Sequence, residues 1–243
     1  QPGISPATGH PGAVSVMQYK EQGFLPEALL NGLVRLGWSH GDDEVFHQGD
    51  LLRLFDIDAV NKTASVFNQD KLVWLNGHYI READPAELIE PFREQLEARG
   101  VDAGAANADL ASIIASLQER TKTLAEMADQ ARFFFEDFGE FEEKAAQKNL
   151  KPADGEPLVD VRHALAELYS WDAEAIHAAI QGVVDAREIK FGKVAQPIRV
   201  AVSGGTVSPP IDATLELLGR EATLARLDRA IAYVRERAEA AGQ

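Results

Sequence analysis

Two stretches of this sequence carry side chains that could perform or support chemistry. The first combines imidazole and carboxylate groups within a short segment, at His40, Asp42, Asp43 and His47. Such groups bind divalent ions or assist hydrolysis when they converge on one point. Their spacing fits no defined ligand motif such as HExxH. A polar loop whose aspartates cap the next helix is therefore favoured over a metal site.

The second stretch is basic, and its positive residues are Arg187, Lys190, Lys193 and Arg199, with Glu188 as the one acid between them. Clustered Lys and Arg supply affinity for phosphate groups, so this segment is a candidate RNA-binding patch, with a solvated helix face as the alternative. A glycine-containing turn follows at residues 203–206, and prolines stand on both sides of it. Because proline restricts the backbone, we expect a stiff connection that presents Arg199 and Ser208. Arginine offers a planar donor fork for base edges or phosphates, and serine offers one small donor.

The elements that would position these residues are mostly helical. Apolar residues recur at three- and four-residue steps in several segments. These segments are residues 26–36, 50–55, 85–100, 109–117, 123–138, 158–168, 173–184 and 212–240. The run 198–202 is either a short strand or a buried helix. Proline, glycine and aspartate at residues 152–157 predict a break between subdomains. The pattern therefore predicts a mostly α protein.

Composition limits the possible functions. Hydrophobic residues make up 45% and charged residues 26% of the chain, as in ordinary soluble globular proteins. The chain has 0 cysteines, which excludes disulfides and thiolate metal sites. Its formal net charge of −15 disfavours indiscriminate nucleic-acid binding but permits a local RNA-binding patch. No run of residues suits a membrane span or a secretion signal, so we expect a cytoplasmic protein without a membrane partner.

Several stretches, in the same order along the chain, resemble bacterial glutamyl-tRNA synthetases, which are class I aminoacyl-tRNA synthetases. Residues 12–19 (GAVSVMQY) resemble the segment that follows the KMSKR loop. Residues 25–31 (LPEALLN), 36–39 (LGWS) and 67–76 (FNQDKLVWLN) resemble the stem-contact region. Residues 120–124 (RTKTL) and 134–137 (FFED) resemble the first anticodon-binding subdomain, and residues 192–201 (GKVAQPIRVA) with 208–209 resemble the second.

The resemblance implies eight nucleic-acid-binding residues. Arg120 matches the arginine that reads the third anticodon base, which suits an Arg fork on a base splayed out of its stack. Arg199, Ser208 and Pro209 match positions around the first and middle anticodon bases. Supporting contacts are expected from Lys193 and Gln196 beside them, and contacts with the inner corner of the tRNA from Lys71 and Asn76.

The resemblance also implies a modular organisation. A helical stem-contact module (residues 12–80) would precede two helical anticodon-binding subdomains (81–152 and 153–243), with residues 1–11 as a disordered arm or non-native remnant. The family's HIGH motif is absent, and His10-Pro11-Gly12 stands where the family has Lys-Arg-His-Gly. The lysines of the KMSKR loop are therefore absent. Because these lysines stabilise charge on the transferring phosphates, this chain alone is expected to be inactive, with no catalytic residue.

The expected function is therefore to bind tRNA(Glu) as part of an enzyme that attaches glutamate to tRNA(Glu). The full-length enzyme would use ATP with magnesium, and we expect no cofactor or metal in this chain. The expected partner is tRNA(Glu), with no DNA partner and a monomeric state. Two alternatives remain open, a helical protein-interaction scaffold that binds no RNA, and a small metal-dependent hydrolase centred on His40, Asp42, Asp43 and His47.

Overall fold

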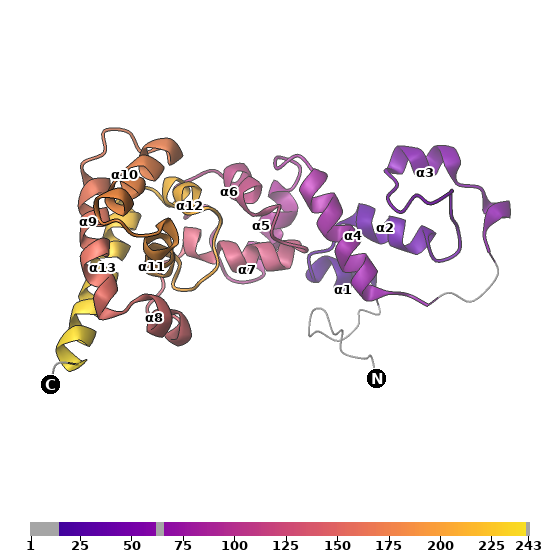
Figure 1. The fold of residues 1–243 in the computed structure, drawn as a ribbon. Coiled ribbons are helices and arrows are strands. Elements are labelled where there is room, and N and C mark those ends of the chain that lie inside the picture. Colours follow the sequence, from indigo (N-terminus) through magenta and orange to yellow (C-terminus); the bar gives the residue numbers. More distant parts are fainter. Residues whose placement is uncertain (1–14, 62–65, 242–243) are drawn as a thin grey trace. The chain divides into compact units, whose positions relative to one another are not determined.

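The computed structural model describes residues 15–61 and 66–241, and the regular elements in these ranges are all helices (Figure 1). The prediction of a mostly α fold is therefore confirmed. The arm predicted at residues 1–11 lies outside the described residues. The run 198–202, which the sequence left open between strand and helix, is helical.

Packing divides the chain into two compact units. Unit 1 comprises residues 1–100 and 117–129, and unit 2 comprises residues 101–116 and 130–243. These boundaries differ from the module boundaries that the resemblance implies, and those modules stay a prediction. Pro152 lies inside unit 2, where the short 3-10 helix η2 (Pro152–Asp154) leads directly into helix α9 (Gly155–Ala166).

Unit 1 is built around two helices that pack against each other, α2 (Pro26–Val34) and α4 (Gln69–Glu82). Buried apolar side chains of both helices meet Phe24, which precedes α2, in a cluster of Phe24, Leu29, Leu72 and Val73. Helix α4 begins where the Asn68 side chain accepts a hydrogen bond from the Lys71 amide at 3.0 Å. The other elements of the unit are α1 (Val16–Glu21), α3 (Gln48–Leu54), the 3-10 helix η1 (Ile57–Ala59), α5 (Ile89–Glu97) and the first half of α7 (Leu124–Phe135).

Unit 2 is a bundle in which α9 packs against α10 (Ala173–Ala186) and α13 (Arg220–Ala241). It also contains α8 (Glu143–Asn149), α11 (Phe191–Ser203), α12 (Ile211–Leu218) and most of α6 (Leu110–Leu117). The segment 212–240 is helical as the sequence predicts, but it forms two helices, because the helical backbone is interrupted at Gly219, whose φ is 85°. This left-handed φ favours glycine, and a Cβ here would also lie 2.8 Å from Asn107 Nδ2, so the Asn107 side chain would have to move.

One buried arginine holds several helix ends of unit 2 together. Arg226 of α13 is only 7% exposed and donates to the carbonyl oxygens of Phe133 (2.9 Å), Val202 (2.6 Å) and Glu136 (3.0 Å). Asp137 supplies the countercharge at 3.3 Å. The last carbonyls of a helix lack partners within the helix. Arg226 satisfies such carbonyls at the ends of α7 and α11 and thereby fixes α11 in place.

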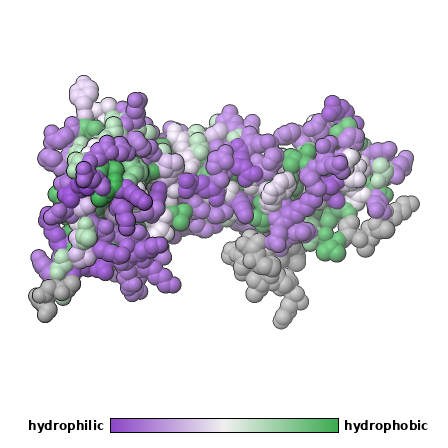
Figure 2. Space-filling model, in the orientation of Figure 1, coloured by the Kyte–Doolittle hydropathy of each residue, from purple (hydrophilic) through white to green (hydrophobic). Residues whose placement is uncertain are grey.

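The face of the molecule that Figure 2 shows is mainly polar. Hydrophilic residues predominate there, and hydrophobic residues form separate areas. Among the described residues, no helix is both long enough and apolar enough to cross a membrane.

Candidate nucleic-acid interface

A hydrogen-bonded group at one end of α11 and the start of α12 gathers three of the predicted site residues. Arg199 of α11 donates from Nε to the Ser208 hydroxyl at 2.9 Å and from Nη2 to the Pro209 carbonyl at 3.5 Å. The Thr214 hydroxyl lies 3.2 Å from both the Ser208 hydroxyl and the Pro209 carbonyl. We call these four residues the Arg199 group. The structure thus brings together Arg199, Ser208 and Pro209, as the resemblance implies.

Within this group the Ser208 hydroxyl forms its hydrogen bonds with other residues of the protein and is not directed at a ligand in solvent. Ser208 is 3% exposed, accepts from Arg199 and donates to the Pro209 carbonyl at 2.9 Å. A hydroxyl has one hydrogen to donate, and here that hydrogen is already used. Ser208 therefore orients the half-buried Arg199 guanidinium. Thr214, which sequence reasoning missed, is 0% exposed and completes the group from within α12.

The backbone that carries Arg199 is a helix, not the stiff connection expected from the prolines. Pro197 lies inside α11, and the helix ends at Gly204, whose φ of 77° is left-handed. A Cβ at Gly204 would lie 3.1 Å from Phe138 Cδ2, so the close approach of Phe138 favours glycine here. Lys193 and Gln196 precede Arg199 at three-residue steps, so all three share one face of α11. Lys193 is exposed and Gln196 is half-buried.

The basic patch predicted over residues 187–199 is smaller than its sequence suggests. Arg187 pairs with Asp160 at 2.5 Å and with Glu156 at 3.3 Å. These two carboxylates more than offset its charge. Lys190 and Lys193 are exposed and stay candidates for phosphate contacts. The positive face of α11 therefore centres on Lys193 and Arg199 rather than on the whole stretch.

Arg120 lies in unit 1, in an exposed turn between α6 and α7. Buried side chains on both sides of Arg120 hold this turn in place. Gln118, which is 7% exposed, donates to the Ile80 carbonyl at 2.7 Å and to the Ala83 carbonyl at 2.9 Å. The hydroxyl of Thr121, which is 1% exposed, donates to the Leu117 carbonyl at 3.1 Å. Because the backbone is held on each side, the Arg120 side chain extends from a defined position on the surface of unit 1.

The two predicted stem-contact residues differ in character. Lys71 is exposed on the first turn of α4 and forms an ion pair with Glu44. Asn76 is 0% exposed, and its amide accepts from the Leu25 amide at 2.7 Å and donates to the Lys122 carbonyl at 2.6 Å. Such a buried amide joins segments of the protein, and its contacts leave no surface for RNA. The structure therefore assigns Asn76 to the internal architecture of unit 1.

The residues of the metal-hydrolase alternative do not form a centre. Within the described ranges, no group of three or more His, Cys, Asp or Glu side chains is placed to hold a metal ion. The His40 ring stacks on Trp38 with ring centroids 6.1 Å apart. His47 instead lies 4.0 Å from Glu82 on α4. The segment is a loop, as the polar-loop interpretation predicts. The prediction that its aspartates cap the next helix is wrong, because His47 is the N-cap of α3 and no side chain makes a capping hydrogen bond there.

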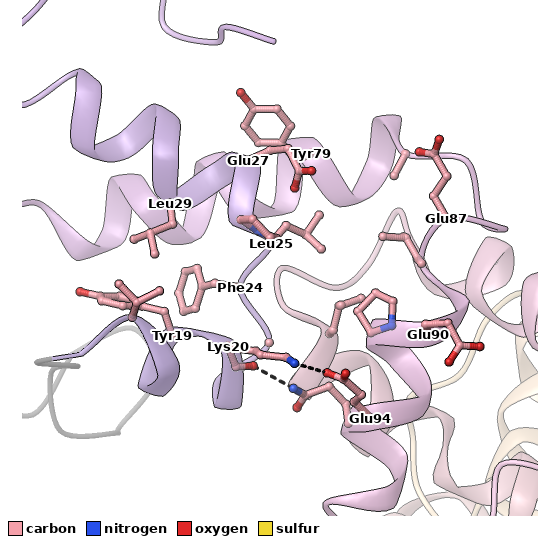
Figure 3. Close-up of a pocket in the computed structure, with 18 of the residues that line it drawn as sticks. Tyr19, Lys20, Phe24, Leu25, Glu27, Leu29, Tyr79, Glu87, Glu90 and Glu94 are labelled. Carbon is pink, nitrogen blue, oxygen red and sulfur yellow. Dashed lines mark hydrogen bonds and ion pairs between the residues drawn. The ribbon is translucent and has the colours of Figure 1, made fainter. Parts of the chain in front are cut away.

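A larger pocket in unit 1, of about 650 Å³, differs in charge from the Arg199 group (Figure 3). Apolar side chains such as Phe24 and Leu29 line it, and its glutamates outnumber its basic residues. The Lys20 ammonium is paired with Glu94 at 2.8 Å, and the Lys20 carbonyl accepts from Gln95 at 2.9 Å. Carboxylates repel RNA phosphates, so we exclude this pocket from the candidate interface.

Two family models match the chain. The model described as "Anticodon binding domain" matches residues 85–231, and the model described as "tRNA synthetases class I (E and Q), catalytic domain" matches residues 10–74. The chain belongs to the anticodon-binding domain family. The segment interpreted above as a stem-contact module thus matches the class I catalytic-domain model.

Individual relatives agree with this family membership. The chain is 52% identical over 223 residues to glutamate–tRNA ligase 1 of Alkalilimnicola ehrlichii, covering 92% of this chain and 47% of that protein. It is 53% identical over 225 residues to glutamate–tRNA ligase 2 of Halorhodospira halophila, covering 93% and 48%. A solved glutamate tRNA ligase from Elizabethkingia meningosepticum, in complex with its amino acid, has a TM-score of 0.80 at 27% identity, covering 96% of this chain and 45% of that one. The chain spans about half the length of the curated relatives it matches.

The predicted anticodon contacts lie within the part of the chain that matches the anticodon-binding domain model. Arg120, Arg199 and Ser208 all lie between residues 85 and 231. Lys71 lies in the segment matched by the class I catalytic-domain model. The candidate interface therefore consists of Arg120 and Lys71 in unit 1 and of the Arg199 group with Lys193 and Gln196 in unit 2.

Proposed function

We propose that this chain is the tRNA-binding part of a glutamate–tRNA ligase and that it reads the anticodon of tRNA(Glu). The Arg199 group carries this proposal. It lies inside the matched anticodon-binding domain, and it holds an arginine by a serine hydroxyl and a proline carbonyl. The hydroxyl and the carbonyl fix the direction in which the guanidinium points. An oriented guanidinium is the side chain that best recognises a base edge or a phosphate.

Arg120 supplies the second element of the proposed reading, at the third anticodon base. Its turn is held by Gln118 and Thr121, while the side chain itself is exposed. Anticodon bases lie in a single-stranded loop, where they can be splayed out and hydrogen-bonded at their edges. A well-formed bidentate contact discriminates against the wrong base by about 1–3 kcal/mol.

The activity of the longer protein follows as part of the same proposal. It would attach glutamate to tRNA(Glu) with ATP and magnesium, in the cytoplasm and as a monomer. The homologues at about 50% identity support this activity because they are glutamate–tRNA ligases. The chemistry would depend on residues outside this chain, and the residues described here would select the tRNA.

A binding titration tests the proposal directly. The chain is titrated at physiological salt with tRNA(Glu) and with a variant changed only at the third anticodon base. We expect the variant to bind more weakly by about 1–3 kcal/mol, the usual effect of losing one base contact. Arg120→Ala should bind both RNAs equally, because it removes the side chain that distinguishes them.

Arg93→Ala is the matched control for Arg120→Ala. Arg93 also lies in unit 1 and in the matched anticodon-binding region, and its partner is Glu90 at 3.5 Å. This substitution removes the same charge and should leave the discrimination between the two RNAs intact. Equal binding of both RNAs by the unsubstituted chain would reject anticodon reading and favour the scaffold alternative.

A further inference from the structure

A second, smaller cavity of unit 1 lies beside α2 and the start of α4 and has a different chemistry from the acidic pocket. Its volume is about 310 Å³. Its polar lining residues are Asn31, Arg35, Glu44, Asn68 and Lys71. Two of these residues are cations, and they come from segments that are distant in the sequence. The cavity thus collects positive charge on an otherwise acidic chain.

A single carboxylate holds both cations. Glu44 accepts from Arg35 Nη2 at 3.2 Å through one oxygen and pairs with the Lys71 ammonium through the other. The hydrogen bond from Lys71 and the charges of Lys71 and Arg35 hold the pKa of the Glu44 carboxyl below its ordinary value. Two positive groups facing one negative group leave a net positive charge. The N-terminal end of α4, a 14-residue helix, adds positive potential at the same place.

The arginine of this cluster retains unused donor capacity. The Arg35 side chain is 19% exposed, and its Nε atom is buried without a hydrogen-bond partner among the described residues. A guanidinium has five N–H donors arranged to grip a planar or tetrahedral oxyanion. Nη2 donates to Glu44 at 3.2 Å and Nη1 to the Trp38 carbonyl at 3.5 Å, so these two contacts use only part of that set. An anion with more acceptor oxygens than a carboxylate would therefore suit Arg35 better.

The loop that carries Glu44 is fixed, whereas its side chain can exchange. Asn31 is 0% exposed, donates to the Glu44 carbonyl at 2.9 Å and accepts from the Phe46 amide at 2.9 Å. The Glu44 and Lys71 side chains are 41% and 47% exposed. Ion pairs at such exposure contribute little to stability, so another anion can replace the carboxylate at small cost.

We propose that this cavity is a subsite for a backbone phosphodiester of RNA, and that Glu44 occupies the phosphate position when RNA is absent. The inference rests on the proposed function, because it assumes that RNA binds this chain. Arg35 and Lys71 are the phosphate-binding residues, and Glu44 is an internal competitor. Such a competitor weakens binding of any single phosphate and favours an RNA that presents its backbone here while being held elsewhere.

The test compares two glutamates that each pair with an exposed lysine in unit 1. Glu44→Gln removes the competitor, and Glu94→Gln removes the carboxylate that pairs with Lys20 at 2.8 Å in the acidic pocket. Both substitutions change the net charge equally. We expect Glu44→Gln to tighten tRNA(Glu) binding about 3- to 10-fold and to steepen the salt dependence by about one counterion, against less than about 2-fold for Glu94→Gln. Lys71→Ala in the Glu44→Gln background should abolish the gain in tRNA affinity.

The outcomes separate this subsite from the proposed anticodon reading. An equal effect of Glu44→Gln and Glu94→Gln, while the third-base discrimination persists, would overturn the subsite alone. A short RNA hairpin without an anticodon loop serves as the second probe, and Glu44→Gln should tighten its binding also. Loss of third-base discrimination together with a gain on the hairpin would support the subsite and reject anticodon reading. Saturable, Glu44-dependent binding of inorganic phosphate alone would show a free-anion site and overturn the assignment to RNA.

Discussion

Ser208 should act on tRNA through Arg199 and not by its own contact with RNA. Its hydroxyl donates to the Pro209 carbonyl and accepts from Arg199 Nε, so no hydrogen is left to offer a base. Ser208→Ala removes the acceptor that orients the guanidinium. The substitution deletes one oxygen from a buried position in the connection between α11 and α12 and should leave both helices unchanged.

The expected size follows from the bond that is lost. A hydrogen bond to a charged group contributes about 1.5–3 kcal/mol, and Arg199 is only half-buried, so water can replace part of it. We therefore expect Ser208→Ala to weaken binding of tRNA(Glu) by about 0.5–1.5 kcal/mol. Arg199→Ala, which removes the contacting group itself, should cost about 1–3 kcal/mol.

A double-mutant cycle measured by tRNA titration decides between the two roles. If Ser208 works through Arg199, then Ser208→Ala has almost no effect on binding in the Arg199→Ala background, and the coupling energy equals nearly the whole single-mutant effect. Ser208→Thr keeps the hydroxyl and should restore most of the affinity. Equal costs of Ser208→Ala in both backgrounds would refute the positioning role and assign Ser208 a direct contact with RNA.

Ser203→Ala provides the matched control for this cycle. Ser203 is also on α11, but its hydroxyl donates to the Arg199 backbone carbonyl at 2.8 Å rather than holding the guanidinium. Its loss removes a comparable hydroxyl from the same helix and should change tRNA affinity by less than the loss of Ser208. Circular dichroism of each variant confirms that the helices are retained.

Two further predictions concern stability. Arg226→Met leaves buried carbonyls without donors, so we expect it to lower the free energy of unfolding of unit 2 by about 3–5 kcal/mol. The control is Arg235→Met at an exposed position of the same helix, which should cost about 0.5 kcal/mol or less. Urea titration and hydrogen exchange of unit 2 peptides measure both effects. Similar losses for both variants would contradict the role of Arg226. In unit 1, burial raises the pKa of Tyr79 to about 12, while its hydroxyl donates to the Phe46 carbonyl. The unfolded state loses this proton first as the pH rises, so stability should be full below pH 10 and fall by up to about 2–3 kcal/mol between pH 10 and 12. Tyr79→Phe should remove this component of the pH dependence, and an unchanged slope of unfolding free energy against pH in urea titrations would count against it.

Much of the helical architecture follows from apolar periodicity and from local capping residues. The helix predicted at residues 109–117 is α6, and Asp109 accepts from the Ser112 amide at 3.0 Å as a cap should. Pro26 likewise begins α2. In contrast, Pro85 opens a turn, and α5 begins only at Ile89. These cases depend on residues close in the sequence, where local chemistry dominates.

Periodicity failed where buried polar or β-branched residues interrupt the pattern. Helix α4 buries Asn76 on its core face, so its apolar stripe is incomplete in the sequence. Helix α11 contains Pro197 and a run of valines and isoleucine, which is also typical of a strand. Tertiary packing makes both segments helical, because their buried faces fit against neighbouring helices. No local signal distinguishes these outcomes.

The candidate site was predictable in its residue types but not in its connections. Arg199 and Ser208 stand out by sequence, whereas the bond between them depends on how α11 meets α12. The cluster of Arg35, Glu44 and Lys71 is even harder to predict from the sequence, because three separate segments must fold to bring these residues together. Burial decides the roles of Ser208 and Asn76, and burial is a property of the whole fold.

The acidity of the chain is compatible with RNA binding because carboxylates and neutral oxygens hold its cations differently. Arg187 and Lys71 are paired with carboxylates, which offset their positive charge unless an RNA phosphate displaces the carboxylate. Arg199 is oriented by a hydroxyl and a carbonyl, which are neutral groups. Phosphate attraction is shared by all RNAs, whereas base contacts differ between them. Pairing cations with carboxylates therefore lowers the phosphate attraction that all RNAs share. The base contacts of an oriented arginine are affected less, so binding of wrong RNAs weakens more than recognition of the right RNA.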